Sequence, residues 1–232
     1  MFDPKKLLDD LLGSTVPGTG STVREKAGQV TRLARDNPIA TGAIAAVLLG
    51  TGAGRALAGT ALKVGGMAAV AGLAYHAYQN YQAGKAPGNG ADGAEVLPPP
   101  SDTAFDPKLA PQGEDDFALT LVRAMVAAAR ADGRIDDEER KRIGDKVALS
   151  GLGEEAEAFL MAEIDNPADI DALAAAAQTD AQKVEIYAAS RLAIEPDTKA
   201  ERGYLDMLAG RLKLPDALVD HVEATIANVS AR

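Results

Sequence analysis

Apolar residues in the second half of the chain recur at helical spacing, most clearly in residues 198–213 and 215–229. Each of these segments carries one apolar face: Leu205, Leu208, Ala209 and Leu212 in the first, and Val219, Val222, Ile226 and Val229 in the second. Such a face is typical of a helix that packs on a core. Together with the Gly, Pro and capping residues between the periodic stretches, the pattern predicts about seven helices: 115–131, 136–149, 153–165, 167–177, 180–194, 198–213 and 215–229. No run alternates as a β-strand does, so the predicted fold class is all-α.

A different pattern occupies residues 37–84, which contain no acidic residue and only two charged ones, Arg55 and Lys63. A soluble helix of this length carries a polar face, and this segment has almost none. Small residues allow membrane helices to approach closely, and Gly50 and Gly54 form a GxxxG step. The glycines that we expect to pack membrane helices are Gly50, Gly54, Gly59, Gly65 and Gly66.

This apolar segment has the length for two short helices, 39–54 and 64–84, joined as a hairpin. The first would rise ~24 Å, against a bilayer hydrocarbon core of ~30 Å. Arg55 and Lys63 would then extend to one interface. The tyrosines that we expect in the aromatic belt at the membrane surface are Tyr75, Tyr78 and Tyr81. The alternative is a soluble glycine-zipper pair that packs against the other domain or self-associates.

The side of the membrane follows from the bases that flank the apolar segment. Four Lys and Arg residues between positions 24 and 35 favour a cytoplasmic N-terminus. A hairpin would return the C-terminal domain to the cytoplasm, whereas a single span would export it. We prefer the hairpin and expect a bacterial inner-membrane protein with a cytoplasmic C-terminal domain.

Net charge is distributed unevenly along the chain. Residues 1–86 hold nine Lys and Arg against five Asp and Glu, whereas residues 114–232 hold 14 against 25. Nucleic acid is a poor partner for such an acidic half, because its recognition requires a basic surface. The stretch between them is rich in Gly and Pro, and is extended around Pro98–Pro100, as expected of a disordered linker. Four regions result: a polar or amphipathic N-terminal region 1–36, a membrane-associated segment 37–84, a disordered linker 85–113 and an acidic all-α domain 114–232, which we expect to fold on its own.

Catalytic chemistry finds little support in the composition. The chain has no Cys and only two His residues, His76 and His221, which lie far apart in the sequence. No phosphate-binding loop and no nucleophile motif occurs. We therefore expect a protein that is not an enzyme, with an acid-only, metal-dependent hydrolase as the least supported alternative.

Two acidic turns, 131–139 and 193–201, are the sharpest local motifs of the C-terminal domain. The first resembles the second half of an EF-hand loop without the first half, so a complete EF-hand is excluded. The turns match each other at an offset of 62 residues. If they meet in space, four side chains converge as a candidate Ca²⁺ or Mg²⁺ site: Asp132, Asp136, Asp197 and Glu201. The alternative is helix capping, by Asp136 with Glu139 and by Thr198 with Glu201.

These motifs carry a family resemblance. The turn Ala131-Asp-Gly-Arg-Ile-Asp-Asp-Glu-Glu139 resembles the signature of the TerB-like helical domain associated with tellurite resistance. Residues 74–82, AYHAYQNYQ, and 193–209, AIEPDTKAERGYLDMLA, are similar to the inner-membrane branch of YebE-like proteins. The resemblance implies a compact all-α domain with an acidic metal site, in a family without an established activity.

The sequence thus predicts a membrane-anchored, non-enzymatic bacterial protein. Its acidic helical domain would be presented for protein or metal interaction, in envelope, tellurite or metal stress. The second hypothesis is a glycine-zipper oligomer that scaffolds or remodels the membrane. No cofactor is expected beyond the divalent cation.

Overall fold

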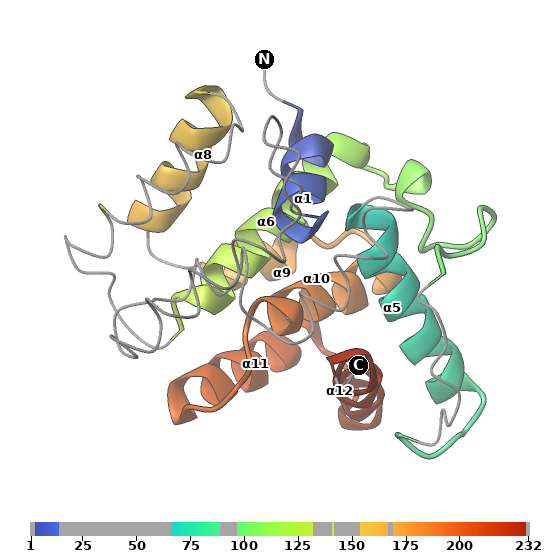
Figure 1. Cartoon of the computed structure of the whole chain (residues 1–232). Coiled ribbons are helices and arrows are strands. Elements are labelled where there is room, and N and C mark those ends of the chain that lie inside the picture. The colour runs from blue at the N-terminus through green and yellow to red at the C-terminus, as the bar shows by residue number, and fades with distance from the viewer. Residues whose placement is uncertain are drawn as a thin grey trace, which may run out of the picture.

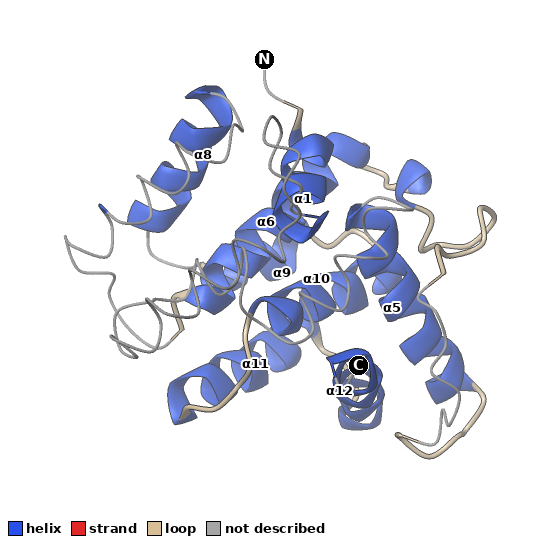
Figure 2. Ribbon diagram, in the orientation of Figure 1, coloured by secondary structure: helices blue, strands red, loops and turns tan. Residues whose placement is uncertain are grey.

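The computed structural model describes residues 3–13, 66–88, 97–131, 141, 154–166 and 169–230. These residues form helices without any strand (Figures 1 and 2), which confirms the all-α prediction. The α-helices are α1 (Pro4–Gly13), α5 (Gly66–Gln82), α6 (Glu114–Ala129), α8 (Glu154–Asp165), α9 (Ile170–Ala176), α10 (Asp180–Ala193), α11 (Lys199–Leu212) and α12 (Asp216–Ser230). A short 3₁₀ turn, η1 (Pro107–Leu109), precedes α6. The predicted helix 136–149 lies outside the described residues, apart from position 141.

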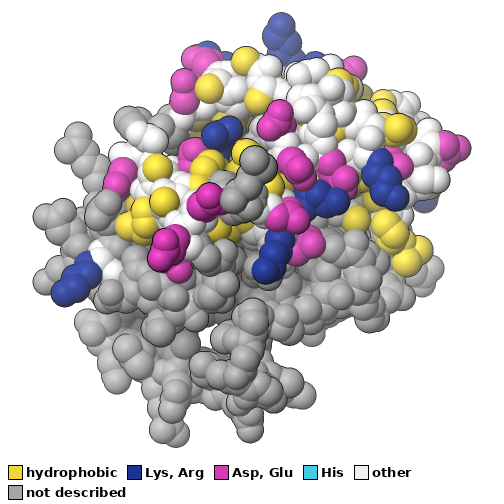
Figure 3. All heavy atoms as spheres, turned by 90° about the horizontal axis from the view of Figure 1, so that it is seen from above, with side chains coloured by type: hydrophobic (Ala, Val, Ile, Leu, Met, Phe, Trp, Pro, Cys, Tyr) yellow, Lys and Arg dark blue, Asp and Glu magenta, His cyan; other side chains and the backbone are white. Residues whose placement is uncertain are grey.

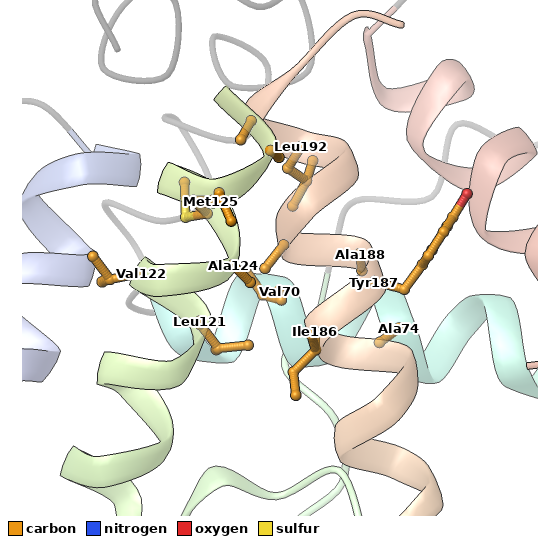
Figure 4. Close-up of a cluster of buried hydrophobic side chains, with 14 of the residues drawn as sticks. Val70, Ala74, Leu121, Val122, Ala124, Met125, Ile186, Tyr187, Ala188 and Leu192 are labelled. Atoms are coloured by element: carbon orange, nitrogen blue, oxygen red, sulfur yellow. The ribbon is translucent and has the colours of Figure 1, made fainter. Parts of the chain in front are cut away.

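The core is built around α10, which packs most extensively along α6 and also contacts α5, α11 and α12. Helix α1 packs on α5 and α6, and α8 lies on the side of α6 away from α5 (Figure 1). Figure 4 shows the resulting cluster, in which α5 contributes Val70 and Ala74 beside side chains of α6 and α10. All members of this cluster are apolar or aromatic, so its stability derives from their removal from water.

Helix α5 lies in this core, and its position differs from the predicted membrane hairpin. The sequence correctly predicts a helix here, but the helix packs on α1, α10 and α12. Its buried residues include all six from Ala69 to Ala74, and six consecutive residues point in every direction around a helix. This first part of α5 is enclosed on all sides and needs no polar face, which is why its composition resembles that of a membrane helix. No helix among the described residues is long and apolar enough to cross a membrane.

Helix α1 is fastened to the first residue of α5. Gly66 N–H donates to Asp9 Oδ1 at 2.5 Å, so a carboxylate lies at the N-terminus of α5, where the helix dipole favours it. A Cβ at Gly66 would lie 2.9 Å from the Leu8 carbonyl oxygen and 3.0 Å from Leu12 Cδ1, so glycine permits the close approach of the two helices. The helix ends that flank residues 14–65, a stretch that we name the insertion, therefore lie side by side in the core.

Residues 97–113 pack on the helices, in contrast to the disordered linker that the sequence predicted. Phe105 is only 5% exposed and its ring contacts α5. The side-chain amides of Gln112 and Gln182 exchange hydrogen bonds of 3.3 and 2.9 Å, which join this segment to the start of α10. The Gly- and Pro-rich composition is therefore compatible with an ordered segment. Residues 97–113 form no long helix, but the side chains of Phe105 and Gln112 hold them on the helical core.

The packing of α5 leads to a new expectation for residues 114–232, which the sequence predicted to fold on their own. This fragment lacks α1, α5 and Phe105, so the apolar faces of α6, α10 and α12 would be exposed to water. We expect the fragment to aggregate or to bind a hydrophobic dye, and to lose the cooperative thermal transition of the full chain. Circular dichroism melting of both proteins measures this. A fragment that melts cooperatively at the temperature of the full chain would contradict the packing described here.

Candidate functional site

The predicted acidic site is only half within the described residues. Asp132 and Asp136 lie outside them, while Asp197 and Glu201 lie at the turn between α10 and α11. Among the residues that the structure describes, no three His, Cys, Asp or Glu side chains are grouped so as to hold a metal ion. The structure therefore brings together no cation site from the two described carboxylates.

Glu201 has a defined partner at this turn. Its Oε2 accepts a hydrogen bond of 2.8 Å from the Thr198 N–H, and Thr198 Oγ1 accepts one of 3.1 Å from the Glu201 N–H. This reciprocal pair is a capping box, which satisfies two backbone donors at the start of α11. Arg202 fixes the preceding turn by donating to the carbonyl oxygens of Pro196 and Asp197 at 2.8 and 2.9 Å. At the turn 193–201, Glu201 therefore caps a helix, as the second of the two interpretations of the acidic turns predicted.

Only some of the residues that we expected to contact the membrane are described by the structure. Gly50, Gly54, Gly59 and Gly65 lie outside the described residues, and Gly66 contacts α1. The three predicted interfacial tyrosines contact other parts of the chain. Tyr75 and Tyr78 have ring centroids 5.6 and 5.5 Å from that of Phe105, and Tyr81 lies 6.2 Å from His221.

An open groove of about 510 Å³ runs between the exposed side of α5 and the loop at residues 103–105. Besides two alanines, its lining consists of Tyr75, Tyr78, Gln79, Gln82, Thr103 and Phe105. None of these described lining residues is charged. Gln79 Nε2 donates to the Tyr75 hydroxyl, and Gln82 Nε2 donates to the Tyr78 hydroxyl at 2.9 Å. Each tyrosine oxygen thus accepts one bond and keeps its own O–H for a further acceptor. We name this feature the aromatic groove.

Two polar networks join the helices beneath the surface. Tyr187 Oη donates to Glu223 Oε1 at 2.8 Å, and Arg191 Nε donates to Glu223 Oε2 at 2.6 Å, which joins α10 to α12. Burial, followed by the adjacent Glu223 carboxylate, raises the pKa of Tyr187 far above its usual range. Ser190 and Tyr204 gather around the Ala124 carbonyl at 3.2 and 3.5 Å, and burial raises the pKa of Tyr204 to about 12. Both phenols stay protonated, so they act as hydrogen-bonding groups.

Glu185 is a buried carboxyl group on α10. Its residue is 2% exposed, and burial raises its pKa well above the usual range for glutamate. Ionising it in the core would cost desolvation energy, so the protonated form is favoured in the folded state.

The surface mixes charges of both signs. Figure 3 shows acidic and basic side chains interspersed on one face, with hydrophobic side chains among them. Ion pairs such as Arg123–Glu163 at 2.9 Å and Lys183–Asp180 at 2.7 Å contribute to this pattern. The described bases of this face form no continuous stripe of the kind that follows a phosphate backbone.

The capping interpretation makes a quantitative prediction. Thr198→Ala removes one acceptor of the capping box and should lower the free energy of unfolding by ~1 kcal/mol. The loss should be the same with EDTA and with millimolar Ca²⁺, as measured by calorimetric melting. A Ca²⁺-dependent rise in the melting temperature of the parent chain, removed by Asp132→Asn with Asp197→Asn, would instead support a metal site.

The Glu185 carboxyl predicts a particular dependence on pH. Because its pKa is raised by folding, the folded state binds the extra proton between the unfolded value of 4.5 and the raised value. Its contribution to stability is complete below 4.5 and is lost as pH rises towards the raised pKa, with a slope of at most ~1.4 kcal/mol per pH unit. Denaturant unfolding of Glu185→Gln should match the parent at pH 4 and exceed it increasingly at higher pH. A constant difference across this range would show that the carboxyl does not titrate as described.

Comparison with known proteins gives a family and no activity. An uncharacterised protein encoded in the ampR 5′ region of Yersinia enterocolitica is 35% identical over 112 residues, which cover 48% of this chain and 81% of that protein. No solved structure matches the chain. The model of the family described as protein of unknown function (DUF533) matches residues 35–226, in agreement with the TerB-like part of the resemblance. The match covers residues 35–65 of the insertion together with the helices from α5 into α12, and the chain belongs to this family.

Proposed function

We propose that the protein is a non-enzymatic bacterial protein that attaches to the inner membrane through residues 37–65 of its insertion. The helical domain stays in the cytoplasm and interacts there with other proteins. Resemblance to the YebE-like branch supports a role in envelope or metal stress. The single observation that carries the proposal is the position of the insertion between two helices, α1 and α5, whose ends meet in the core.

The composition of residues 37–65 supports attachment to lipid. This stretch has no acid and only two bases, Arg55 and Lys63, in a chain of net charge −10. From Gly66 onward the predicted apolar segment packs in the core as α5, so only residues 37–65 are proposed to enter lipid. The small residues of this stretch, including the Gly50–Gly54 step, suit close contact between helices in lipid.

The contact between Asp9 and Gly66 supports entry and exit on the same side of the membrane. Both residues belong to one packed core, so the insertion crosses the bilayer an even number of times or enters it only partly. A single exporting span does not fit this arrangement. Residues 56–65 would rise only ~15 Å as a helix, less than the ~30 Å hydrocarbon core, which favours a shallow hairpin.

The charges favour the cytoplasmic side. The bases between residues 24 and 35 precede the apolar stretch, as expected for segments retained inside. Anionic lipids of the inner leaflet attract these bases. The strongly acidic domain is repelled by the same surface and would project from it towards partners in solution.

A second candidate function is self-association through the glycine-rich stretch, with scaffolding or remodelling of the bilayer. The Gly50–Gly54 step favours it, since such steps pack helix pairs. Gly50→Leu with Gly54→Leu would remove crosslinked oligomers in lipid under this hypothesis. Membrane attachment through apolar burial would persist in the same variant.

Replacement of residues 14–65 by a short Gly/Ser linker tests the attachment. Because the ends of the insertion adjoin, we expect the shortened chain to keep its cooperative melting and to move from the membrane to the soluble fraction. Flotation of both chains with inner-membrane vesicles measures this. If the full chain fails to float, or if the shortened chain floats equally well, the proposal is wrong.

Engineered cysteines test the sidedness in the same chain, which has no natural cysteine. Lys6→Cys and Lys85→Cys place one thiol before and one after the insertion, both on exposed residues. A membrane-impermeant maleimide should label neither in intact cells with a permeabilised outer membrane, and both after lysis. Labelling of either thiol in intact cells would contradict a cytoplasmic domain.

A further inference from the structure

Glu185 places a carboxyl group in the apolar core, on the helix that contacts α5, α6, α11 and α12. Its neighbours on the same face of α10, one turn before it and one and two turns after it, are the buried Ala181, Ala188, Ala189 and Leu192. Among the described residues, none donates a hydrogen bond to this carboxyl or forms an ion pair with it. The surroundings therefore accept the neutral carboxyl and offer nothing to a carboxylate.

The charged residues of the surrounding helices are exposed or bound elsewhere. Helix α5 has no Asp, Glu, Lys or Arg residue. Those of α6, α11 and α12 are exposed, apart from three that have partners: Glu114 with Lys5, Glu201 with Thr198 and Glu223 with Arg191. On α10 itself, Lys183 pairs with Asp180. None of these charges contributes to the raised pKa of Glu185, whose cause is burial.

The other buried titratable groups of the described helices also make contacts of their own. Tyr187 donates to Glu223, and the Tyr204 hydroxyl lies 3.5 Å from Ser190 Oγ. The His221 ring packs against that of Tyr81 on α5. Glu185 is thus the group in this core whose charge state has no partner to fix it, so water is what its ionised form requires.

We propose that the Glu185 carboxyl is a proton-binding site that keeps the core around α10 closed, and that loss of this proton opens α10 locally to water. The closed state binds the proton, because a carboxylate there would be buried without donors. The open state releases it, because water solvates the carboxylate. Protonation thus selects between two states of the same chain. This device does not depend on membrane attachment.

The contacts of the core allow the opening to be local. Helix α1 packs directly on α5 and on α6, and η1 contacts the same two helices. The Asp9–Gly66 and Lys5–Glu114 contacts belong to this group, and neither involves α10. Helices α1, α5 and α6 can therefore stay together while the face of α10 that carries Glu185 becomes hydrated, as in the sub-global openings of other proteins.

The direction of the response to pH follows from the two states. In the open state the carboxyl has its ordinary pKa of 4.5, whereas in the closed state burial raises its pKa well above that value. Below pH 4.5 both states are protonated, so pH does not affect the opening. Above it, the opening equilibrium rises by up to tenfold per pH unit, and it levels off at the raised pKa.

Thiol reactivity tests the opening in the full chain, which has no natural cysteine. Ala189→Cys places a buried thiol one turn after Glu185 on the same face of α10. Its rate of reaction with dithiodipyridine, divided by the rate of the denatured chain at each pH, should be constant below pH 4.5 and rise by up to tenfold per unit above it. The same thiol together with Glu185→Gln should show no such rise.

Ala118→Cys is the matched control. Ala118 is equally buried and lies one turn before Val122, which is on the side of α6 that faces α1 (Figure 4). Its normalised rate should not rise with pH in either chain. An equal rise at Ala189→Cys with Glu185 and with Gln overturns the proposal. So does an equal rise at Ala118→Cys and Ala189→Cys, because the whole core would then be unfolding.

Nuclear magnetic resonance of the chain without introduced cysteines gives a second measurement. The carbon-13 signal of the Glu185 carboxyl, assigned by its loss in Glu185→Gln, should titrate at higher pH than that of the exposed Glu154. Over the same range, the protection of α10 amides from hydrogen exchange should fall in the parent chain and stay constant in Glu185→Gln. If Glu185 titrates together with Glu154, or α10 keeps its protection while Glu185 titrates, the carboxyl does not control an opening.

Discussion

The first part of helix α5, from Gly66 to Ala74, is buried on nearly every side, and the small residues along it set the distances between its neighbours. Gly66 allows α1 to approach, and alanines such as Ala74 allow α10 and α12 to pack closely. A larger side chain at these positions would separate the helices that meet around α5, because cores are packed without spare volume. The positions of α1, α10 and α12, and of the segment that carries Phe105, all depend on this one enclosed helix.

Local patterns in the sequence were sufficient to predict most helices of the described chain. Leu205, Leu208 and Leu212 are buried on one side of α11, as their spacing required, and Thr198 with Glu201 begins that helix. Helix α5 was also predicted as a helix, but its surroundings were predicted to be lipid. An apolar surface on all sides is compatible with a bilayer and with the centre of a bundle. The distinguishing contacts come from residues distant in sequence, such as Asp9 and Phe105.

Contacts between residues distant in sequence also explain why some candidate sites could be predicted and others could not. The capping box was among the predicted alternatives because its two members are three residues apart. Gln112 and Gln182 are 70 residues apart, and Tyr187 and Glu223 are 36 apart, with no spacing rule that links them. The aromatic groove combines two tyrosines predicted for a membrane surface with a phenylalanine from a predicted linker. Only the folded arrangement brings those rings together.

The adjoining ends of α1 and α5 also determine how the insertion affects folding. Closing a flexible loop costs entropy that grows only with the logarithm of its length, so a doubling of the loop adds just ~0.6 kcal/mol. The Asp9–Gly66 contact and the packing of Leu8 and Leu12 on α5 fix both ends. The mutual packing of α1 and α5 is therefore fixed by residues within the two helices, and the length of the chain that joins them makes only a small difference to the cost of bringing their ends together.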